Sequence, residues 1–235
     1  MADGRIGNTR GMENDPRQLT ETDRTRLRRE PDRGRFDRDT IDAIIDTALI
    51  CHLGFNDEQG RPVVIPTIHA RIGDTLYVHG SAASRALRAM AKGVEVCCTI
   101  THLDGLVVAR SGFASSMNYR TVMVFGPARL VDDPAEIAAA LDAIVDHVLP
   151  GRVGEIRPNT SKELAATKVI ALPIDEASAK VRTGGVNDEE ADLGTPVWAG
   201  VVPLRIVAGE PEPSDDVPAD VRVPDSVRRV IQQHP

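Results

Sequence analysis

The 235-residue sequence contains few aromatic residues, few cysteines and no long apolar run. Aromatic residues make up 3% of the chain, and Trp198 is the single tryptophan. Because no apolar stretch approaches the roughly 18 residues that a membrane-spanning helix needs, we expect no membrane span. The N-terminus lacks the apolar segment of a secretory signal, and it carries acids as well as arginines, unlike a transit peptide. These absences predict a cytoplasmic protein.

The cysteines and histidines show no pattern that binds metal or forms a disulfide framework. Three cysteines occur, Cys51, Cys97 and Cys98, and an odd count with an adjacent pair does not fit paired bridges. On a strand, Cys97 and Cys98 would face opposite sides, so we expect two small, half-buried side chains. Cys51 and His52 would diverge in the same way, and we expect no metal site.

The charge balance and the motif inventory exclude several function classes. A formal net charge of −7 opposes general nucleic-acid binding, which needs a basic surface. The chain contains no GxSxG, Walker loop, HExxH or GxGxxG. The sequence therefore predicts no nucleic-acid partner, and it offers no pattern for a serine hydrolase, P-loop nucleotidase or zinc protease.

Composition divides the chain into three regions. Residues 1–38 carry ten arginines and eight acids and few apolar residues, so they form either a solvated charged arm or an arm that wraps a partner subunit. Residues 39–209 contain the periodic apolar pattern of a folded domain. Residues 210–235 are acidic and rich in proline, which predicts a disordered tail or one that lies along the surface.

The apolar periodicity predicts hairpins with helices inserted between them. We expect helices over 39–48, 81–93 and 135–149 and a helical turn over 161–167, with Thr40 as the first N-cap. Expected strands cover 50–56, 61–72, 75–80, 95–103, 106–113, 121–133, 168–175, 177–184 and 196–209, with a hairpin turn at Asp104-Gly105. The strands and helices do not alternate regularly. The pattern therefore favours a mainly β fold with inserted helices, a closed or split antiparallel β-barrel.

The strongest candidate site begins the helix predicted after residue 80. Ser81 and Ser84 can donate hydroxyl hydrogen bonds there, and Arg85 can bind phosphate oxygens through its planar guanidinium. Arg88 lies one turn further along, close to the same face. Because a helix N-terminus also presents free N–H groups, this segment predicts an anion site, although a plain serine cap with solvated arginines fits the same residues.

Three other features offer possible cofactor contacts. A polar cluster precedes the long strand at 121–133 and consists of Ser115, Ser116, Asn118, Tyr119 and Arg120. This cluster suits ring and ribityl oxygens of a cofactor, and it equally suits an ordinary polar loop. Trp198 is either a core residue or a platform for a planar cofactor. His69 and His79 flank an expected hairpin, could face each other across it, and either line a pocket or are hydrogen-bonded core residues.

Five segments in order resemble one known family. They are RREPDRGRFDRDTIDAIID, HLGF, RPVVIPTIHARIGDTLYVHGSAASR, SSMNYRTVMVFG and PVWAGVVPLR, and together they cover about residues 24–208. This set resembles the FMN-binding branch of the pyridoxamine 5′-phosphate oxidase-like proteins that includes the nitroimidazole-resistance reductases.

The resemblance implies a split-barrel homodimer with FMN in grooves at the subunit interface. Ser84 and Arg85 match the first two residues of the Ser-Arg-Lys motif that holds the FMN phosphate in the oxidases, and Ala86 replaces the lysine. Pro66, Thr67 and Ile68 match the strand that lies along the isoalloxazine ring. The resemblance also implies that the SSMNYR segment approaches the flavin, that Trp198 packs on its ring, and that His79 lies among the cofactor-binding residues.

The sequence thus predicts an FMN-dependent oxidoreductase that acts on a small molecule, in which the flavin performs the redox chemistry and the protein orients it. Two alternatives stay open. One is a flavin-binding module without catalysis, and the other is a haem-binding split barrel.

Overall fold

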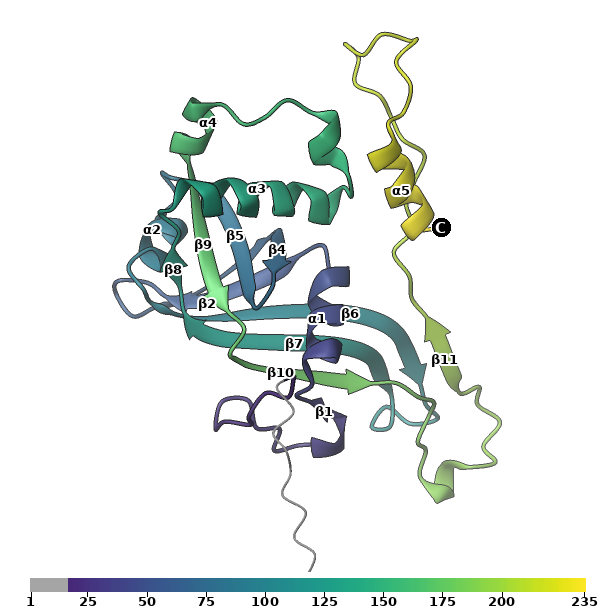
Figure 1. Ribbon diagram of the computed structural model, residues 1–235. Helices are drawn as coiled ribbons and strands as arrows, with labels where there is room; N and C mark the ends of the chain where they lie inside the picture. Colours follow the sequence, from purple (N-terminus) through teal and green to yellow (C-terminus); the bar gives the residue numbers. More distant parts are fainter. Residues whose placement is uncertain (1–16) are drawn as a thin grey trace, which may run out of the picture.

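Two antiparallel sheets form a split β-barrel in the computed structural model, which describes residues 17–235 (Figure 1). The larger sheet has the order β1 (Gly34–Arg35), β10 (Glu176–Arg182), β7 (Ser116–Pro127), β6 (Glu95–Val108), β2 (Cys51–Asn56) and β3 (Pro62–Thr67), and β11 (Gly200–Pro203) pairs with the far part of β6. The smaller sheet has the order β4 (His69–Ile72), β5 (Thr75–Ser81), β9 (Thr167–Pro173) and β8 (Arg129–Leu130). The predicted fold class is confirmed.

Five α-helices surround these sheets in the part of the chain that the structure describes. They are α1 (Arg38–Thr47), α2 (Arg85–Met90), α3 (Pro134–Val148), α4 (Ser161–Ala166) and α5 (Asp225–Gln233), with short 3-10 turns at Pro31–Arg33, Arg152–Glu155 and Glu190–Asp192. None of the helices between residues 17 and 235 is both long enough and apolar enough to cross a membrane.

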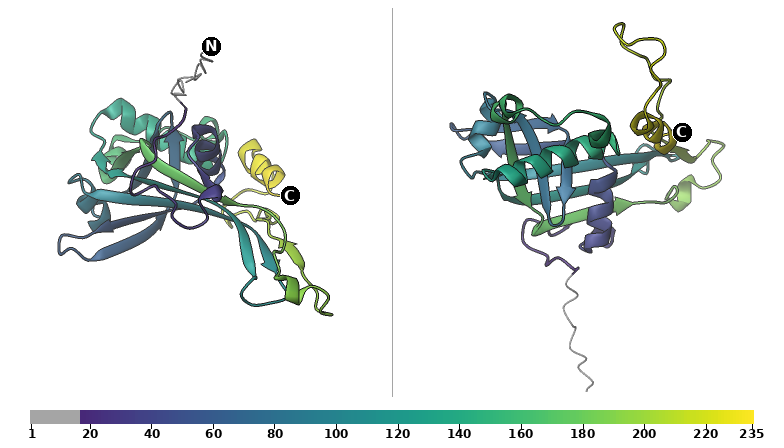
Figure 2. Two further views of the ribbon diagram at one scale, coloured as in Figure 1. Left: turned by 90° about the horizontal axis from the view of Figure 1, so that it is seen from below. Right: turned by 45° about the horizontal axis from the view of Figure 1, so that its top comes forward.

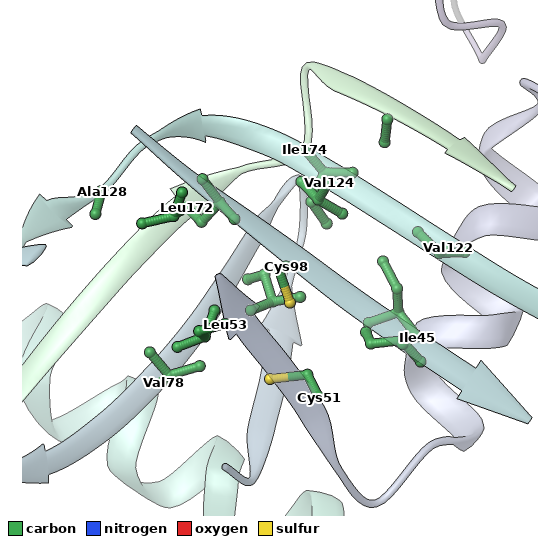
Figure 3. Packing of buried hydrophobic residues seen from close by; sticks show 14 of the residues in the cluster. Ile45, Cys51, Leu53, Val78, Cys98, Val122, Val124, Ala128, Leu172 and Ile174 are labelled. Atoms are coloured by element: carbon green, nitrogen blue, oxygen red, sulfur yellow. The ribbon is translucent and has the colours of Figure 1, made fainter. Parts of the chain in front are cut away.

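The core has two apolar layers. The main layer lies between the two sheets and includes Cys51, Cys98 and Val122, which point into one shared interior (Figure 3). A second layer lies between the smaller sheet and α3, where Tyr77 and Ile144 are buried together. Helix α3 therefore covers the outer face of the smaller sheet, as the ribbon diagram shows (Figure 1).

Helix α1 contacts both sheets, including β4 and β7, and buries one apolar face against them. Its N-cap is Asp37, whose carboxylate accepts a hydrogen bond from the Thr40 N–H at 2.8 Å, so the prediction of Thr40 as the cap was wrong. Buried Arg38 donates to the Ile174 carbonyl at 2.8 Å and pairs with Asp42 at 2.8 Å. These contacts fix the helix against the barrel.

The expected strand over 61–72 is two strands, because the chain passes from one sheet to the other at Ile68. Strand β3 ends at Thr67 and pairs with β2, whereas β4 begins at His69 and pairs with β5. Proline at 66 donates no ladder hydrogen bond, which suits a strand that leaves its sheet there. This crossing places residues 65–68 between the two halves of the barrel.

The predicted hairpin turn at Asp104-Gly105 was also wrong. Strand β6 continues through both residues to Val108, with an irregular register to β7 between Leu103 and Gly105. A Cβ at Gly105 would lie 3.0 Å from the Val202 carbonyl oxygen, so glycine is needed for the close approach of β11. The resulting long ribbon of β6 and β7 extends away from the barrel together with β11 (Figure 2).

The two ends of the chain carry more structure than their composition indicated. Residues 1–16 of the predicted arm lie outside the described residues, but β1 pairs with β10, and Thr25 is buried. The acidic tail includes α5, where the Ser226 hydroxyl donates to the Glu155 carboxylate at 2.5 Å. Specific polar contacts to the folded chain thus stabilise a segment that has little apolar surface to bury.

Candidate functional site

A broad groove lies between the β2–β3 hairpin and α2. Its volume is about 1020 Å³. It is lined by Phe55, Asp57, Glu58, Gln59, Arg61, Pro62, Val63, Ile65, Ser84, Arg85, Ala86, Arg88, Ala89 and Lys92. We call this cavity the cationic groove, because four of its side chains are arginine or lysine.

The start of α2 forms one wall of the cationic groove. Ser84 is the N-cap, and its hydroxyl oxygen accepts a hydrogen bond from the Leu87 N–H at 3.4 Å. Ser81 caps the preceding turn by accepting from the Ala83 N–H at 3.2 Å. Both hydroxyl hydrogens stay available for an anion. The helix spans only Arg85–Met90, shorter than the predicted 81–93, because Ser81 still belongs to β5.

The cations of the groove fall into two groups. Lys92 pairs with Glu58, and Arg61 pairs with Asp57 at 2.7 Å, so these two charges are balanced inside the groove. Within residues 17–235, neither Arg85 nor Arg88 forms an ion pair or a side-chain hydrogen bond. The Glu58 carboxylate attracts Arg88 as well as Lys92, whereas Arg85 has no ion pair among the described residues, and this makes the Arg85 guanidinium the group best suited to a phosphate ligand.

The opposite wall is apolar and comes from β3. Val63 and Ile65 face the groove from one side of the strand, and Phe55 follows from the paired strand β2. Pro66 and Thr67 continue β3 toward the crossing but do not line the groove. An apolar wall opposite a cationic one suits a flat, phosphorylated ring compound.

A second, smaller cavity lies on the other side of the crossing, under α3. Its volume is about 340 Å³. It is lined by Ile68, His79, Leu141, Ile144, Val145, Val148, Leu149, Asn159, Glu163 and Thr167. We call it the apolar cavity. The predicted site residues Ile68 and His79 therefore lie apart from Ser84 and Arg85.

His79 and His69 do not face each other. His69 pairs with Val78 across the β4–β5 hairpin, so His79 lies on the opposite face of β5. His69 is completely buried, its Nε2–H donates to the Ile45 carbonyl at 3.0 Å, and its ring lies 4.8 Å from the ring of His147. The expectation that His69 and His79 meet across the hairpin was wrong.

The polar cluster lies on the ribbon, at a distance along the sheet from α2. It belongs mainly to strand β7 rather than to a loop. Arg120 forms a two-pronged ion pair with Asp104 at 2.9 and 3.0 Å, and the Asn118 amide donates to the Gly184 carbonyl at 2.9 Å. Ser115 accepts from the Ala109 N–H at 3.2 Å. Ser116 and Tyr119 lie on the same strand.

Trp198 is exposed rather than buried in the core. Its side chain is 64% exposed, and its ring lies over Gly200, where a Cβ would approach Cζ2 to 2.8 Å. The core interpretation of this residue was therefore wrong. The ribbon exposes further large apolar side chains, namely Leu103, Leu106, Phe113, Met117, Val202 and Leu204.

Residues 37–181, more than half of the chain, match the family model described as pyridoxamine 5′-phosphate oxidase. The chain belongs to this family. Of the residues that the sequence analysis named, Ser84, Arg85 and Arg88 line the cationic groove. The lining residues Phe55, Arg61 and Lys92 were not predicted, because nothing in their local sequence distinguishes them from ordinary strand and surface residues.

Two solved structures resemble this member of the family over most of its length. One is the flavocytochrome Anf3 from Azotobacter vinelandii, with 41% identity and a TM-score of 0.83, covering 88% of this chain and 96% of that one. The other is the FAD and heme binding protein from Mycobacterium smegmatis, with 40% identity and a TM-score of 0.80, covering 84% and 96%.

A more distant structure supports the predicted branch. It is a protein from Bacteroides thetaiotaomicron assigned to 5-nitroimidazole antibiotic resistance, with 26% identity and a TM-score of 0.55, covering 63% of this chain and 86% of that one. Among curated proteins there is no match.

Proposed function

We propose that the protein is a redox flavoprotein that binds the phosphate of its flavin between the start of α2 and the β2–β3 hairpin. The single observation that carries this proposal is the cationic groove, in which the Arg85 guanidinium forms no ion pair among the described residues and shares the groove with the apolar side chains of β3. The membership in the pyridoxamine 5′-phosphate oxidase family supports the same cofactor class.

The residues present fit a flavin nucleotide. Arg85 would supply charge-assisted hydrogen bonds and the Ser84 hydroxyl a neutral one for phosphate oxygens. Val63 and Ile65 supply an apolar surface along which the rest of the cofactor extends toward Pro66 and Thr67. The flavin would supply two-electron redox chemistry, and this chain would bind it, orient it and limit its access to water.

FMN is the cofactor that the sequence predicts, and FAD is a second candidate favoured by one observation. Arg88 lies one turn beyond Arg85 in the same groove, and a second phosphate would suit it. The relative from Mycobacterium smegmatis is an FAD and heme binding protein. Mass spectrometry of the cofactor released by heat distinguishes the two nucleotides.

A homodimer would complete the site. The ribbon carries the predicted residues Asn118, Tyr119 and Arg120 together with Trp198, far from α2 in the same chain. Its exposed side chains, such as Phe113 at 92%, form an apolar surface that is unfavourable in water unless a partner covers it. We therefore propose that the ribbon of one subunit covers the groove of the other. Light scattering of the purified protein should give the mass of a dimer.

Haem is proposed as a second cofactor rather than as a replacement for flavin. The two relatives at about 40% identity are a flavocytochrome and an FAD and heme binding protein, so both cofactors occur together in such chains. The substrate would be a small molecule or an electron acceptor, and the cytoplasmic location stays a prediction. A flavin that no nicotinamide donor reduces would instead support a binding module without catalysis.

The test of the flavin site compares Arg85→Ala with Arg228→Ala, an exposed arginine on α5. Arg85→Ala should purify with about tenfold less flavin, because one charge-assisted phosphate contact contributes roughly 1.5–3 kcal/mol. Arg228→Ala should keep the wild-type flavin content. Equal flavin content in both variants would contradict the phosphate assignment.

A further inference from the structure

We propose that the apolar cavity under α3 is the haem site of this protein and that His79 is the axial ligand of the haem iron. This inference rests on the proposed redox function, and it adds the location and the ligand. Nothing in the family match assigns either of them, because the match covers both cavities without distinguishing them.

The walls of the apolar cavity suit a porphyrin ring. Five of its lining residues are aliphatic. They lie on α3 and at its C-cap, and they form one continuous face: Leu141, Ile144, Val145, Val148 and Leu149. Ile68 closes the opposite side. A volume of about 340 Å³ is smaller than a whole haem, so the open side of the cavity would leave the polar edge of the ring in solvent.

His79 is the side chain in this cavity that can ligate iron. It shares a face of β5 with Tyr77, which packs in the layer under α3, so the imidazole points toward the helix. Its Nδ1 is buried without a hydrogen-bond partner among residues 17–235. Burial lowers the pKa of His79 below the ordinary histidine value, so the ring is neutral near pH 7. A neutral imidazole is the form that binds iron.

A porphyrin fits this site better than a bare metal ion. Within the described chain, no group of three or more histidine, cysteine, aspartate or glutamate side chains converges on one point. A free ion would need several such ligands, whereas haem brings four ring nitrogens and requires only one or two axial ligands from the protein. A single histidine in an apolar cavity is therefore sufficient.

The other buried histidines are less suitable. His147 is engaged through Nε2 with the Ala48 carbonyl at 2.6 Å, and it packs on the ring of His69. His69 lies in the interior with no exposed surface, and neither ring lines the apolar cavity. Their ring centroids are 4.8 Å apart, which leaves no room for a porphyrin between them.

The acid at the rim does not oppose this assignment. Glu163 lines the cavity, but the Arg157 guanidinium binds its carboxylate at 2.6 and 2.9 Å and holds its pKa well below the usual range. The pair is neutral overall.

The apolar cavity and the cationic groove are close along the chain, on the two sides of the crossing from β3 to β4. Ile65 lines the groove and Ile68 lines the apolar cavity, and three residues of extended chain span about 10 Å. Two redox cofactors at these positions would be neighbours within one subunit.

The experiment is a titration of the purified full-length protein with hemin, followed by absorption and resonance Raman spectra. The wild type should bind one hemin per chain with the spectrum of an imidazole-ligated iron. His79→Gly should bind hemin at least about tenfold more weakly, since even the loss of an outer-shell partner costs that much. Added imidazole should restore the ligated spectrum in His79→Gly, which a merely structural role for His79 would not explain.

His147→Gln and His102→Gln are the matched controls, because both histidines bond backbone carbonyls outside the cavity. Both variants should keep the wild-type spectrum. Val145→Trp fills the cavity while His79 stays, and it should weaken hemin binding even if His79→Gly does not fold. An unchanged spectrum in His79→Gly, or wild-type protein that binds no hemin, would overturn the assignment.

Flavin content, measured in the same samples, separates the two proposals. Flavin-free protein that binds hemin through His79 supports the haem site and contradicts the flavin function. Flavin-loaded protein whose hemin spectrum does not depend on His79 supports the flavin function and contradicts the haem site.

Discussion

The cationic groove and the apolar cavity lie on the two sides of one strand crossing, yet they are built from opposite chemistry. The groove presents Arg85 and Arg88 to solvent and would hold a ligand by charge. The apolar cavity presents aliphatic side chains of α3 and the imidazole of His79, and it would hold a ligand by burial. The two sites should therefore respond to different perturbations, although Ile65 and Ile68 place them only a few residues apart.

The difference also has a structural cause. The groove lies at the edge of the barrel, where the β2–β3 hairpin and the short helix α2 leave charged side chains in water. The apolar cavity lies beneath α3, which covers the smaller sheet and excludes water from Leu141 and Ile144. One fold thus offers a polar and an apolar cofactor environment without a second domain.

The largest expected effect is the loss of flavin from Arg85→Glu combined with Arg88→Glu. Each charge-assisted contact contributes roughly 1.5–3 kcal/mol, so the pair should weaken flavin binding by about a hundredfold or more. Hemin affinity should change by no more than about twofold, as expected for independent sites. Parallel flavin and hemin titrations check this, and equal losses of both ligands would show that the two cavities are one site.

The second largest expected effect is on the stability of the protein, which substitutions in the two cavities should change by different amounts. Ile144→Ala removes a buried side chain between α3 and the sheet, and it should lower the free energy of unfolding by about 2–5 kcal/mol. Arg88→Ala in the groove should change it by no more than about 0.5 kcal/mol. Urea unfolding of the cofactor-free proteins measures both values. A costly Arg88→Ala would mean that the groove is a structural element rather than a binding site.

The third prediction concerns pH. Because burial lowers the pKa of His79, its ring is neutral at pH 7 and takes up a proton only on acidification below the ordinary histidine range. Hemin affinity should therefore be constant above that pKa and fall by about tenfold for each further pH unit below it. Arginine guanidinium groups do not lose their charge over this pH range, so flavin affinity should not follow this profile. Hemin binding that strengthens as the pH falls would exclude His79 as the ligand.

The smallest effect concerns salt. Phosphate contacts in the groove are partly screened, so flavin affinity should fall by roughly severalfold between low and high sodium chloride. Hemin affinity should stay nearly constant, because burial dominates binding in the apolar cavity. Fluorescence quenching of the released flavin gives the first curve and the absorption titration gives the second.

Part of the cationic groove could be predicted from the sequence, whereas the apolar cavity could not. Ser84 and Arg85 stand at a helix start that local sequence alone identifies, and the structure confirms that both line a groove. The apolar cavity depends on where along β5 the helix α3 packs, and no local sequence pattern determines that position. His79 was therefore assigned to the flavin rather than to a cavity of its own.

The errors in the prediction of the fold have the same origin. Gly105 was interpreted as a turn residue, but it serves the close approach of β11, a contact between segments almost a hundred residues apart. The split at Ile68 depends on which sheet each half joins, and strand periodicity is the same in both. Local propensity predicted where strands occur, whereas tertiary pairing determined where they end.

The most direct test of the account is a crystal structure of the full-length protein as isolated with its flavin and then loaded with hemin. We expect flavin phosphate oxygens bound by Ser84 and Arg85, and haem iron bonded to a ring nitrogen of His79 under α3. Flavin phosphate at any other position, or iron bonded to a different histidine, would contradict it.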